Sequence, residues 1–526
     1  MTGRLIVHVS TDELAARAGE LLAGGYRLAL AAAHEDPGAM RLVYLFTAGT
    51  PDRRTELHVR LDPHEPVVPS LAALSYPAGR FEREMHDLYG VVPSGHPLPR
   101  RLVRHHHWPR GWYPMRADAG PPPAFGDPEG PFPFVTVEGP GVYEIPVGPV
   151  HAGLIEPGHF RFSVVGETIL KLKARLWFVH RGVEKLFAGR ALADGLPLAE
   201  RISGDTSVGH ALAYCLAVEE ATGLAVGTQA QRMRAVLLEL ERLYNHVTDL
   251  GALCNDVAHG ILHAQAGRVR ERLLRINDEV TGHRLLRGGV TLGGVALRAL
   301  PDPAALRAVA ADVAEISELA LGHTVVADRF TGTAVLTATA ARDLGVLGYA
   351  ARASGVAADA RRDHPFTDLG PFEPVTCDAG DVTARFQVRA REVAASAELI
   401  IRLLGGMSPG EERAWPPHTT AAGGPSEVAS GTELGTASGM ASGTASGTAS
   451  GTASGVASGV GVVEGWRGTI IHRVEFAPGG ALARVKIVDP SFFNWPALPV
   501  ALSGAIVPDF PLVNKSFNLS YAGNDL

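Results

Sequence analysis

The chain contains 526 residues, which at roughly 150 residues per domain is enough for about three domains. Hydrophobic residues make up 46% and charged residues 20% of it, a balance that supports large buried cores and excludes global disorder. The net charge of −7 argues against nucleic acid as a partner. The three cysteines, none in a CxxC pair, exclude a disulfide scaffold, a thiolate zinc site and an iron–sulfur cluster ligated by this chain alone.

Neither a membrane span nor an export signal is evident in the sequence. No segment approaches the ~20 uninterrupted apolar residues that cross a bilayer. Residues 1–7 lack the long apolar region and small-residue cleavage site of a signal peptide. We therefore expect a cytoplasmic polypeptide that meets a membrane only through a partner.

Residues 1–116 predict a compact α+β domain. Ser10 and Glu13 have the spacing of a capping box, so a helix is expected to begin there and to end at Gly24. Short β-rich runs follow at residues 26–30, 40–46 and 56–61. Several strands with a helix packed on one face would satisfy this pattern.

Residues 117–141 are rich in proline and glycine and are interpreted as a linker. Residues 142–526 then predict a mainly helical second domain, in which apolar residues recur at i, i+3, i+4 and i+7. The helical segments are expected at 167–187, 209–225, 229–258, 268–280, 301–321, 337–344 and 390–404.

A degenerate Gly-Thr-Ala-Ser repeat occupies residues 421–461. It contains almost no large apolar side chains and cannot offset the entropy of ordering, so it is expected to be a disordered insertion. Because ordered patterns return after it, the insertion interrupts the second domain and does not divide two domains.

Four separated motifs contain the residues that could carry chemistry. They lie at residues 179–185 (VHRGVEK), 200–210 (ERISGDTSVGH), 464–468 (EGWRG) and 488–495 (VDPSFFNW). Taken singly, each has a plain structural interpretation: Arg181 and Glu184 as an ion pair on a helix face, His210 as a buried structural histidine, and Asp489 as part of a turn. Their joint occurrence, in this order, calls for a common explanation.

Together the motifs resemble the large subunit of nickel–iron hydrogenases and its relative, the D-type subunit of respiratory complex I. Residues 201–210 are similar to the hydrogenase element RxCGxCxxxH, and residues 489–494 to the element DPCxxC. Residues 181–184 resemble the RGxE element, whose glutamate transfers protons. By this resemblance Arg467 matches an arginine placed over the metal site.

The N-terminal domain carries a second resemblance. Residues 81–90 (FEREMHDLYG) and 96–102 (HPLPRRL) look like the signature of the C-type subunit of complex I. A C-type domain fused to a D-type domain resembles the large subunit of the hydrogenase-3 and hydrogenase-4 type. The fold implied is an α+β domain followed by a mainly helical hydrogenase-like domain.

The four metal-ligand positions of the resemblance depart from the hydrogenase pattern. They hold Ser203, Thr206, Ser491 and Asn494 in place of cysteines. Nickel and iron in such a site require soft thiolate ligands, and a neutral hydroxyl or amide is a hard, weak ligand. We therefore predict no metal bound by this chain, with Asp205, Thr206 and Ser491 forming a polar, hydrogen-bonded plug as one alternative.

The D-type subunit of complex I also lacks these cysteines and binds a quinone headgroup at the vacated site. By resemblance His151 matches the histidine that faces the quinone, and a histidine can both hydrogen-bond a quinone carbonyl and protonate it. Residues 203–206 replace the tyrosine-bearing loop of the D-type subunit. Arg181, Glu184, His210 and Arg467 are the candidate proton-handling residues, and we expect them to line one cleft.

The favoured function is a subunit of a membrane-associated, complex I-like NADH:quinone oxidoreductase or energy-converting hydrogenase, with a metal-free pocket for quinone or proton-coupled electron transfer. A non-catalytic structural subunit of such a complex is the alternative, and a true hydrogenase is the least supported. The resemblance implies a small iron–sulfur subunit, which would hold the clusters, and antiporter-like membrane subunits as partners. It places the chain peripherally on the cytoplasmic side of the membrane.

Overall fold

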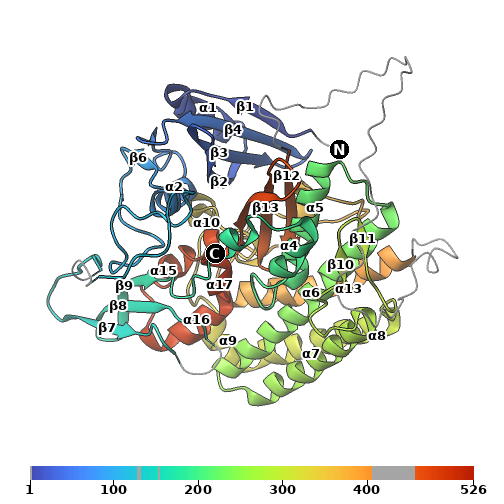
Figure 1. Ribbon diagram of the computed structural model, residues 1–526. Coiled ribbons are helices and arrows are strands. Elements are labelled where there is room, and N and C mark those ends of the chain that lie inside the picture. The colour runs from blue at the N-terminus through green and yellow to red at the C-terminus, as the bar shows by residue number, and fades with distance from the viewer. Residues whose placement is uncertain (1–2, 127–131, 152–154, 406–456) are drawn as a thin grey trace, which may run out of the picture.

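The computed structural model describes residues 3–126, 132–151, 155–405 and 457–526. Helices and strands both occur in it, and the α+β class is confirmed (Figure 1). A strand-rich N-terminal unit is followed by a larger, mainly helical part, and a three-stranded sheet near the C-terminus lies between them.

The N-terminal unit is a four-stranded sheet with the strand order β1-β4-β3-β2. Its elements are β1 (Leu5–His8), α1 (Thr11–Ala23), β2 (Arg27–Asp36), β3 (Ala39–Ala48), β4 (Arg53–Leu61), β5 (Val67–Pro69), α2 (Tyr76–Tyr89) and β6 (Val92–Ser94). The capping box of Ser10 and Glu13 is present and Gly24 ends α1, as predicted. Strand β3 is buried along its whole length because both faces of the sheet are covered.

A second sheet contains β7 (Val142–Val147), β8 (His159–Val165) and β9 (Thr168–Arg175) in antiparallel order. The helix predicted at 167–187 is therefore wrong: its first half is β9, and only α3 (Val183–Phe187) is helical. Gly166, at a φ of 57°, lets the chain reverse tightly between β8 and β9. That turn signal outweighs the apolar spacing on which the helix prediction was based.

In the helical part the other predicted segments are all helical, but the two predicted to begin at 268 and 390 begin at Gly260 and Val382. Its helices are α4 (Leu192–Ala199), α5 (Ser207–Thr222), α6 (Thr228–Asp256), α7 (Gly260–Thr281), α8 (Pro303–Gly322), α9 (Thr324–Phe330), α10 (Ala338–Leu344), α11 (Gly348–Arg352), α12 (Ala360–Asp363) and α13 (Val382–Gly405). A short hairpin, β10 (Val290–Thr291) and β11 (Gly294–Val295), joins α7 to α8. No helix among the described residues is long and apolar enough to span a bilayer.

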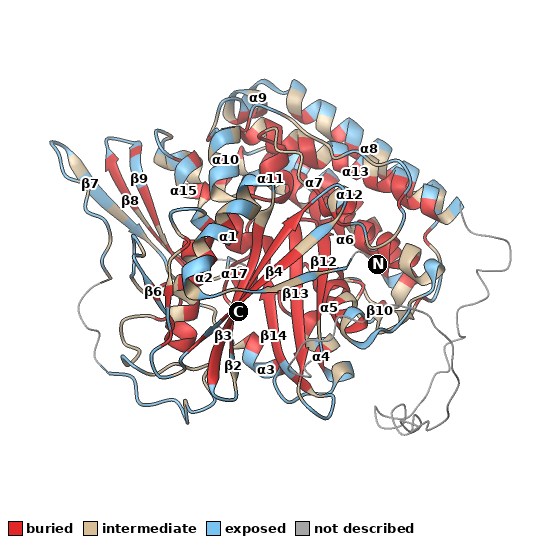
Figure 2. Ribbon diagram, turned by 90° about the horizontal axis from the view of Figure 1, so that it is seen from above, coloured by how far each residue is buried: buried red, intermediate tan, exposed pale blue. Residues whose placement is uncertain are grey.

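The C-terminal sheet has the antiparallel order β12-β13-β14 and lies at the centre of the molecule (Figure 2). Its strands are β12 (Ser458–Gly465), β13 (Gly468–Phe476) and β14 (Leu482–Val488). Helix α5 packs so closely on one face that a Cβ on Gly461 would lie 1.9 Å from the carbonyl oxygen of Ala213. On the other face Arg473 binds Glu56 of the N-terminal sheet, which joins the two units through buried charges.

The end of the chain forms short helices around the last strand. They are α14 (Pro490–Asn494), α15 (Ala497–Ala501), η2 (Val507–Asp509), α16 (Phe510–Phe517) and α17 (Tyr521–Asn524). Residues 421–456 of the predicted insertion lie outside the described residues. The predicted end of the insertion, at residue 461, is wrong, because β12 begins at Ser458 and pairs with β13 from that residue onward.

Candidate functional site

Three chain segments converge on one polar cluster. The loop before α5 carries Ser203, Asp205 and Thr206, and the turn between β12 and β13 carries Arg467. The C-terminal segment supplies the third side: Ser520, at the start of α17, lies 2.9 Å from Ser203, oxygen to oxygen. Segments more than 250 residues apart thus build the site.

Asp205 and Arg467 form the centre of this cluster. Both guanidinium nitrogens Nη1 and Nη2 of Arg467 lie 2.7 Å from an oxygen of the Asp205 carboxylate. Ser203 and Thr206 each donate a hydroxyl hydrogen bond of 3.0 Å to the same carboxylate. Burial opposes ionisation of Asp205, but the Arg467 charge and these hydroxyls hold its pKa below the ordinary value.

Trp466 and Asn518 fix the two partners in place. The indole Nε1 of Trp466 donates to the Asp205 carbonyl oxygen at 3.1 Å, and its ring lies 3.9 Å from the Arg467 guanidinium carbon. Arg467 Nε also donates to the carbonyl oxygen of Asn518. The Asp205 side chain remains 39% exposed, so the carboxylate sits at the edge of the cluster.

Ser491 belongs to the same cluster, whereas Asn494 does not. The Ser520 amide donates to the Ser491 hydroxyl at 3.0 Å, so Ser203, Ser520 and Ser491 form a continuous hydrogen-bonded series. The Asn494 amide instead bonds both backbone groups of Leu347, at 2.8 and 3.2 Å. Asn494 therefore ties α14 to the segment before α11.

His210 lies in a fully buried relay next to this cluster. Its Nε2 is 3.1 Å from Asp489 Oδ2, and its Nδ1 is 3.0 Å from His472 Nε2. Burial and the neighbouring His210 lower the pKa of His472, so its neutral form is favoured. The pKa of Asp489 is lowered against the effect of burial by His210 and also by the charge of Arg467. Asp489 also accepts from the Ser491 amide at 2.7 Å, so this network adjoins the Asp205–Arg467 cluster through Ser491 and Ser520.

Glu184 lies in a different buried cluster. Its carboxylate accepts from Arg484 at 2.7 Å and from the Ile487 amide at 3.0 Å, and Lys486 lies 3.0 Å away. Burial would raise the pKa of Glu184, but the two cations lower it to about 2. Lys486 also contacts Glu84 of α2 at 2.8 Å, which makes this cluster part of the contact between the two units.

Arg181 and His151 each bind backbone carbonyl groups. Arg181 is exposed and donates to the carbonyl oxygens of Arg201 and Ile202, directly before Ser203. The surface ion pair predicted between Arg181 and Glu184 is therefore wrong, since each has other partners. His151 Nε2 lies 2.7 Å from the Gly158 carbonyl oxygen, and Gly158 packs against Tyr521, the neighbour of Ser520.

The structure thus places only two of the four candidate proton-handling residues, His210 and Arg467, in adjoining networks, which meet through Ser491 and Ser520. It also shows residues that sequence reasoning did not name as partners, among them Trp466, His472, Asn518 and Ser520. Trp466 adjoins Arg467 in a motif already singled out. Ser520 and Asn518 gave no signal, because they lie outside the four motifs.

A nickel–iron centre does not fit the residues at the four predicted ligand positions. Their side chains offer hydroxyl and amide groups, which are hard, weak ligands. The Ser203 and Thr206 hydroxyls donate hydrogen bonds to the Asp205 carboxylate, and the Asn494 side chain accepts one from the Leu347 amide. Among the residues that the structure describes, no group of three or more His, Cys, Asp or Glu side chains is arranged to hold a metal ion.

Buried ion pairs hold the turn that presents Arg467. Arg242 donates to the carbonyl oxygens of Glu464 and Gly465, and Arg352 lies 2.9 Å from the Glu464 carboxylate. Glu464 also accepts from the Ala360 amide at 3.0 Å. Helices α6, α11 and α12 therefore set the position of the β12–β13 turn.

Three protein-family models match the chain. The respiratory-chain NADH dehydrogenase 30 Kd subunit matches residues 7–123, the nickel-dependent hydrogenase family residues 181–255, and the respiratory-chain NADH dehydrogenase 49 Kd subunit residues 256–525. Their order is the order in which the sequence motifs occur.

Individual relatives extend over most of the chain. Formate hydrogenlyase subunit 5 of Escherichia coli is 31% identical over 89% of this chain and 79% of its own length. Hydrogenase-4 component G of E. coli is 31% identical over 84% of this chain and 73% of its own length. The C/D subunit of the NADH-quinone oxidoreductase of Phocaeicola vulgatus is 30% identical over 66% of this chain and 71% of its own length.

A solved structure shares the fold. A chain of the membrane-bound sulfane sulfur reductase, an archaeal respiratory membrane complex, aligns with a TM-score of 0.60 and 23% identity, over 73% of this chain and 99% of that chain. Together with the matched families and relatives, this fold shows that the chain belongs to the family that unites the 30-kDa and 49-kDa subunits of respiratory NADH dehydrogenases with the large subunits of nickel-dependent hydrogenases.

Proposed function

We propose that this chain is the large subunit of a membrane-associated oxidoreductase related to complex I and to energy-converting hydrogenases. In this proposal the Asp205–Arg467 site handles protons that accompany electron transfer, without a nickel–iron centre. The relatives named above are components of formate hydrogenlyase, of hydrogenase-4 and of NADH-quinone oxidoreductase, which supports an oxidoreductase complex as the setting.

The observation that carries the proposal is the partly exposed Asp205 carboxylate. The Arg467 guanidinium and the hydroxyls of Ser203 and Thr206 bind this carboxylate. The two hydroxyls stand at positions where the sequence motifs would place metal ligands. Hydroxyl groups can both accept and donate a proton, and the buried Asp489–His210–His472 relay continues the polar network inward. The lowered pKa keeps the Asp205 carboxylate ionised beside Arg467, so in this proposal Asp205 orients the Ser203 and Thr206 hydroxyls, which pass the proton.

A quinone is the acceptor class that this site would serve. Reduction of a quinone to a quinol consumes two electrons and two protons, and the electrons would come from an iron–sulfur cluster in a partner subunit. His151 is the residue that we propose faces the quinone headgroup, and its contact with Gly158 places it near the tail residue Tyr521. A small iron–sulfur subunit and antiporter-like membrane subunits complete the proposed assembly. In it, this chain lies peripherally on the cytoplasmic side of the membrane.

The alternative, a purely structural subunit, is favoured by a different observation. The side chains of Ser203, Thr206, Ser491 and Asn494 all have hydrogen-bond partners within the chain. A polar network satisfied in this way can stabilise the fold without any reaction. The two functions predict different effects of an Asp205 substitution on the activity of the complex.

The test uses the complex purified from membranes in mild detergent. A low-potential donor, reduced methyl viologen, is supplied with a soluble quinone analogue, and quinol formation is compared between the natural chain and Asp205→Asn. We expect quinol formation to fall by about tenfold or more while the set of subunits stays unchanged, because the neutral amide no longer holds Arg467 and the two hydroxyls in place, and proton-transfer groups typically contribute about 10²–10⁴-fold.

Two results would overturn the proposal. Unchanged quinol formation in an intact Asp205→Asn complex would favour the structural alternative. Stoichiometric nickel together with hydrogen evolution from reduced methyl viologen would show hydrogenase activity instead.

A further inference from the structure

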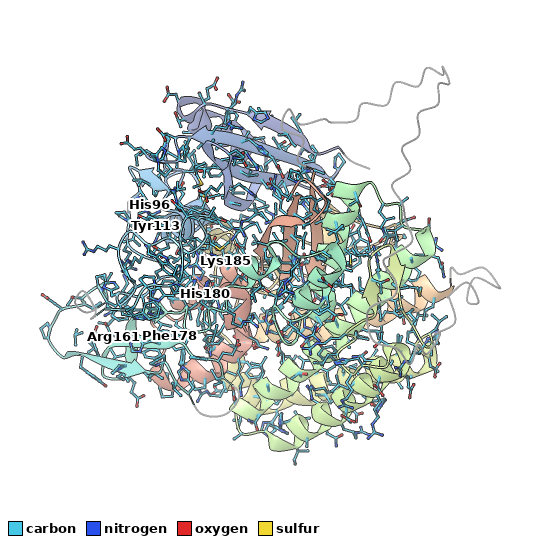
Figure 3. All side chains as sticks on the ribbon, viewed as in Figure 1. His96, Tyr113, Arg161, Phe178, His180 and Lys185 are labelled. Atoms are coloured by element: carbon cyan, nitrogen blue, oxygen red, sulfur yellow. The ribbon has the colours of Figure 1, made fainter. Side chains whose placement is uncertain are left out.

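One side of the molecule carries a surface rich in arginine and aromatic side chains. It forms where residues 96–116 pack against residues 175–186, and we call it the arginine–aromatic surface. Arg175 donates to the carbonyl oxygens of Leu102, Val103 and Arg104, and the His105 ring lies 4.5 Å from the Phe178 ring. Figure 3 labels Tyr113, Phe178, His180 and Lys185, which all lie on this side.

The charge of this surface is the reverse of the charge of the whole chain. The chain has a net charge of −7, yet residues 88–117 contain no aspartate or glutamate. The same stretch contains five arginines: Arg100, Arg101, Arg104, Arg110 and Arg116. Of these, Arg116 pairs with Asp118, just outside the stretch, at 3.0 Å. A positive patch on an acidic protein requires an explanation.

The cations of this surface are bonded mainly to backbone carbonyl groups. Arg100 donates to Pro133, Arg101 to His105 and Trp108, and Arg104 to Pro109 and Trp112. Lys185 donates to Pro114 in the same way. These contacts fix the four side chains but leave their charges without a bonded carboxylate among the described residues.

Two buried arginines strengthen the case. Arg104 and Arg175 are almost wholly buried, and the Nε atom of each has no hydrogen-bond partner in the described part of the chain. Burial lowers the pKa of Arg175 to about 10, although the charges of Asp87 and Asp525 offset part of this effect. Holding an irregular loop needs hydrogen-bond donors, but neutral amides would provide them without the free-energy cost of burying a charged group.

Apolar side chains lie exposed among the cations. Leu98, Phe125, Phe178 and Leu186 are between 37% and 53% exposed. Trp108 and Trp112 of this surface lie beside each other, and Phe125, from the segment that follows, stacks on Trp108. Exposed aromatic and aliphatic groups among arginines are the composition typical of the energetic centre of protein interfaces.

We propose that the arginine–aromatic surface is the docking site of a protein partner that presents carboxylates between apolar side chains. Arginines already held in fixed geometry suit paired recognition of carboxylates. A bilayer surface would instead favour long, mobile basic side chains, and Lys185 is the one lysine in residues 96–116 and 175–186. This inference goes beyond the proposed redox function, since docking does not depend on the chemistry at Asp205.

The first test places a photocrosslinking amino acid, p-benzoylphenylalanine, at Phe178 in the complex as purified from membranes. The control carries it at Ile261 of α7, which is 73% exposed and lies outside this surface. We expect Phe178 to crosslink to a segment of another protein that contains aspartate or glutamate, and Ile261 not to crosslink to that segment. Crosslinks to lipid only, to a second copy of this chain, to a segment without acidic residues, or to nothing would overturn the proposal.

The second test reverses one charge. Lys185→Glu is compared with Arg307→Glu, which changes an exposed residue of α8 away from this surface. Retention of the crosslinked partner is measured during washes of rising salt concentration. We expect Lys185→Glu to weaken retention roughly three- to tenfold at low salt, with a smaller effect at high salt, because salt screens exposed charges. Equal retention by the two variants, each with an unchanged melting temperature, would contradict the electrostatic part of the proposal.

Discussion

Arg467 and Asp205 are 262 residues apart in the sequence and form a two-point ion pair with both nitrogen–oxygen distances at 2.7 Å. This pair joins the turn between β12 and β13 to the loop before α5. Because Asp205 also binds the hydroxyls of Ser203 and Thr206, one carboxylate organises most of the cluster. Its removal should therefore have measurable structural consequences besides those on activity.

The first prediction concerns Asp205→Asn and the free energy of unfolding. Arg467 is buried and would lose its charged partner, an effect that costs about 3–5 kcal/mol in a fully buried pair. Since the Asp205 side chain is 39% exposed, water screens part of this cost, and we expect about 1–2 kcal/mol. Urea unfolding measures the change, and Asp194→Asn on an exposed face of α4 is the control, expected within about 0.5 kcal/mol. Equal stabilities would show that the pair contributes nothing to folding.

The second prediction concerns acid sensitivity at the contact between the N-terminal sheet and β13. Burial lowers the pKa of His34 to about 4, below its ordinary value of 6.5, although its Nδ1 lies 3.2 Å from Glu475. A lowered folded pKa means that stability is complete above pH 6.5 and is lost as the pH falls toward 4. The shift corresponds to about 3 kcal/mol across this range.

We expect His34→Gln to lose less stability between pH 6.5 and 4 than the natural chain does. His64→Gln, at an exposed position between β4 and β5, is the control and should follow the natural chain. Below pH 4.5 the natural chain and His34→Gln should both lose further stability, because Arg473 and Arg4 hold the pKa of Glu56 well below its ordinary value despite burial. Parallel curves for His34→Gln and the natural chain would contradict this account.

The sequence predicted the long amphipathic helices well and the polar site only in part. Helices α6 and α8 lie within a few residues of their predicted ranges because their apolar periodicity is long and regular. Helix α5, which is buried on nearly all sides, and the seven-residue α10 also lie close to their predicted ranges. The segment at 167–187 was mispredicted because a two-residue turn at Gly166 carries more information than the spacing of its apolar residues.

The site illustrates a different limit. Motifs identified Arg467, His210 and Asp205 because these residues lie in distinctive local patterns. They did not indicate that Glu184 would turn toward Arg484 and Lys486, or that Ser520 would complete the cluster. Those contacts depend on how β14 and the C-terminal helices pack against the rest of the chain. The spacing of residues within a motif does not predict that packing.

The third prediction concerns Lys486, which lies between Glu84 and Glu184 at 2.8 and 3.0 Å. Burial and the nearby Glu184 raise the pKa of Glu84, which is bonded to Lys486, whereas Glu184 is bonded to Arg484 as well. Lys486→Met alone should cost about 3–5 kcal/mol, because both acids would lose a buried partner. Combining it with Glu84→Gln should cost less than the sum, with a coupling on the order of 1–3 kcal/mol.

A matched exposed pair provides the control for this cycle. Arg17 and Glu20 lie 2.9 Å apart on α1 with side chains 56% and 64% exposed. Water and salt screen such pairs, so their coupling should be about 0.5 kcal/mol or less. Similar coupling in both cycles would show that burial does not strengthen the Lys486 cluster.

The last prediction concerns the C-terminal segment. Asp525 is buried and accepts hydrogen bonds from the Val179 amide at 3.0 Å and from His180 Nδ1 at 2.9 Å. Asp525→Ala removes both contacts and leaves the Val179 amide to find another partner, which should cost about 2–3 kcal/mol. Because Ser520 lies on the same segment, the loss should loosen residues 519–525 and 176–181 together. Hydrogen–deuterium exchange should therefore rise in both segments, whereas Asp343→Ala, at an exposed position of α10, should leave them unchanged. A rise confined to residues 519–525 would show that the tail does not hold the segment that carries Phe178 and His180.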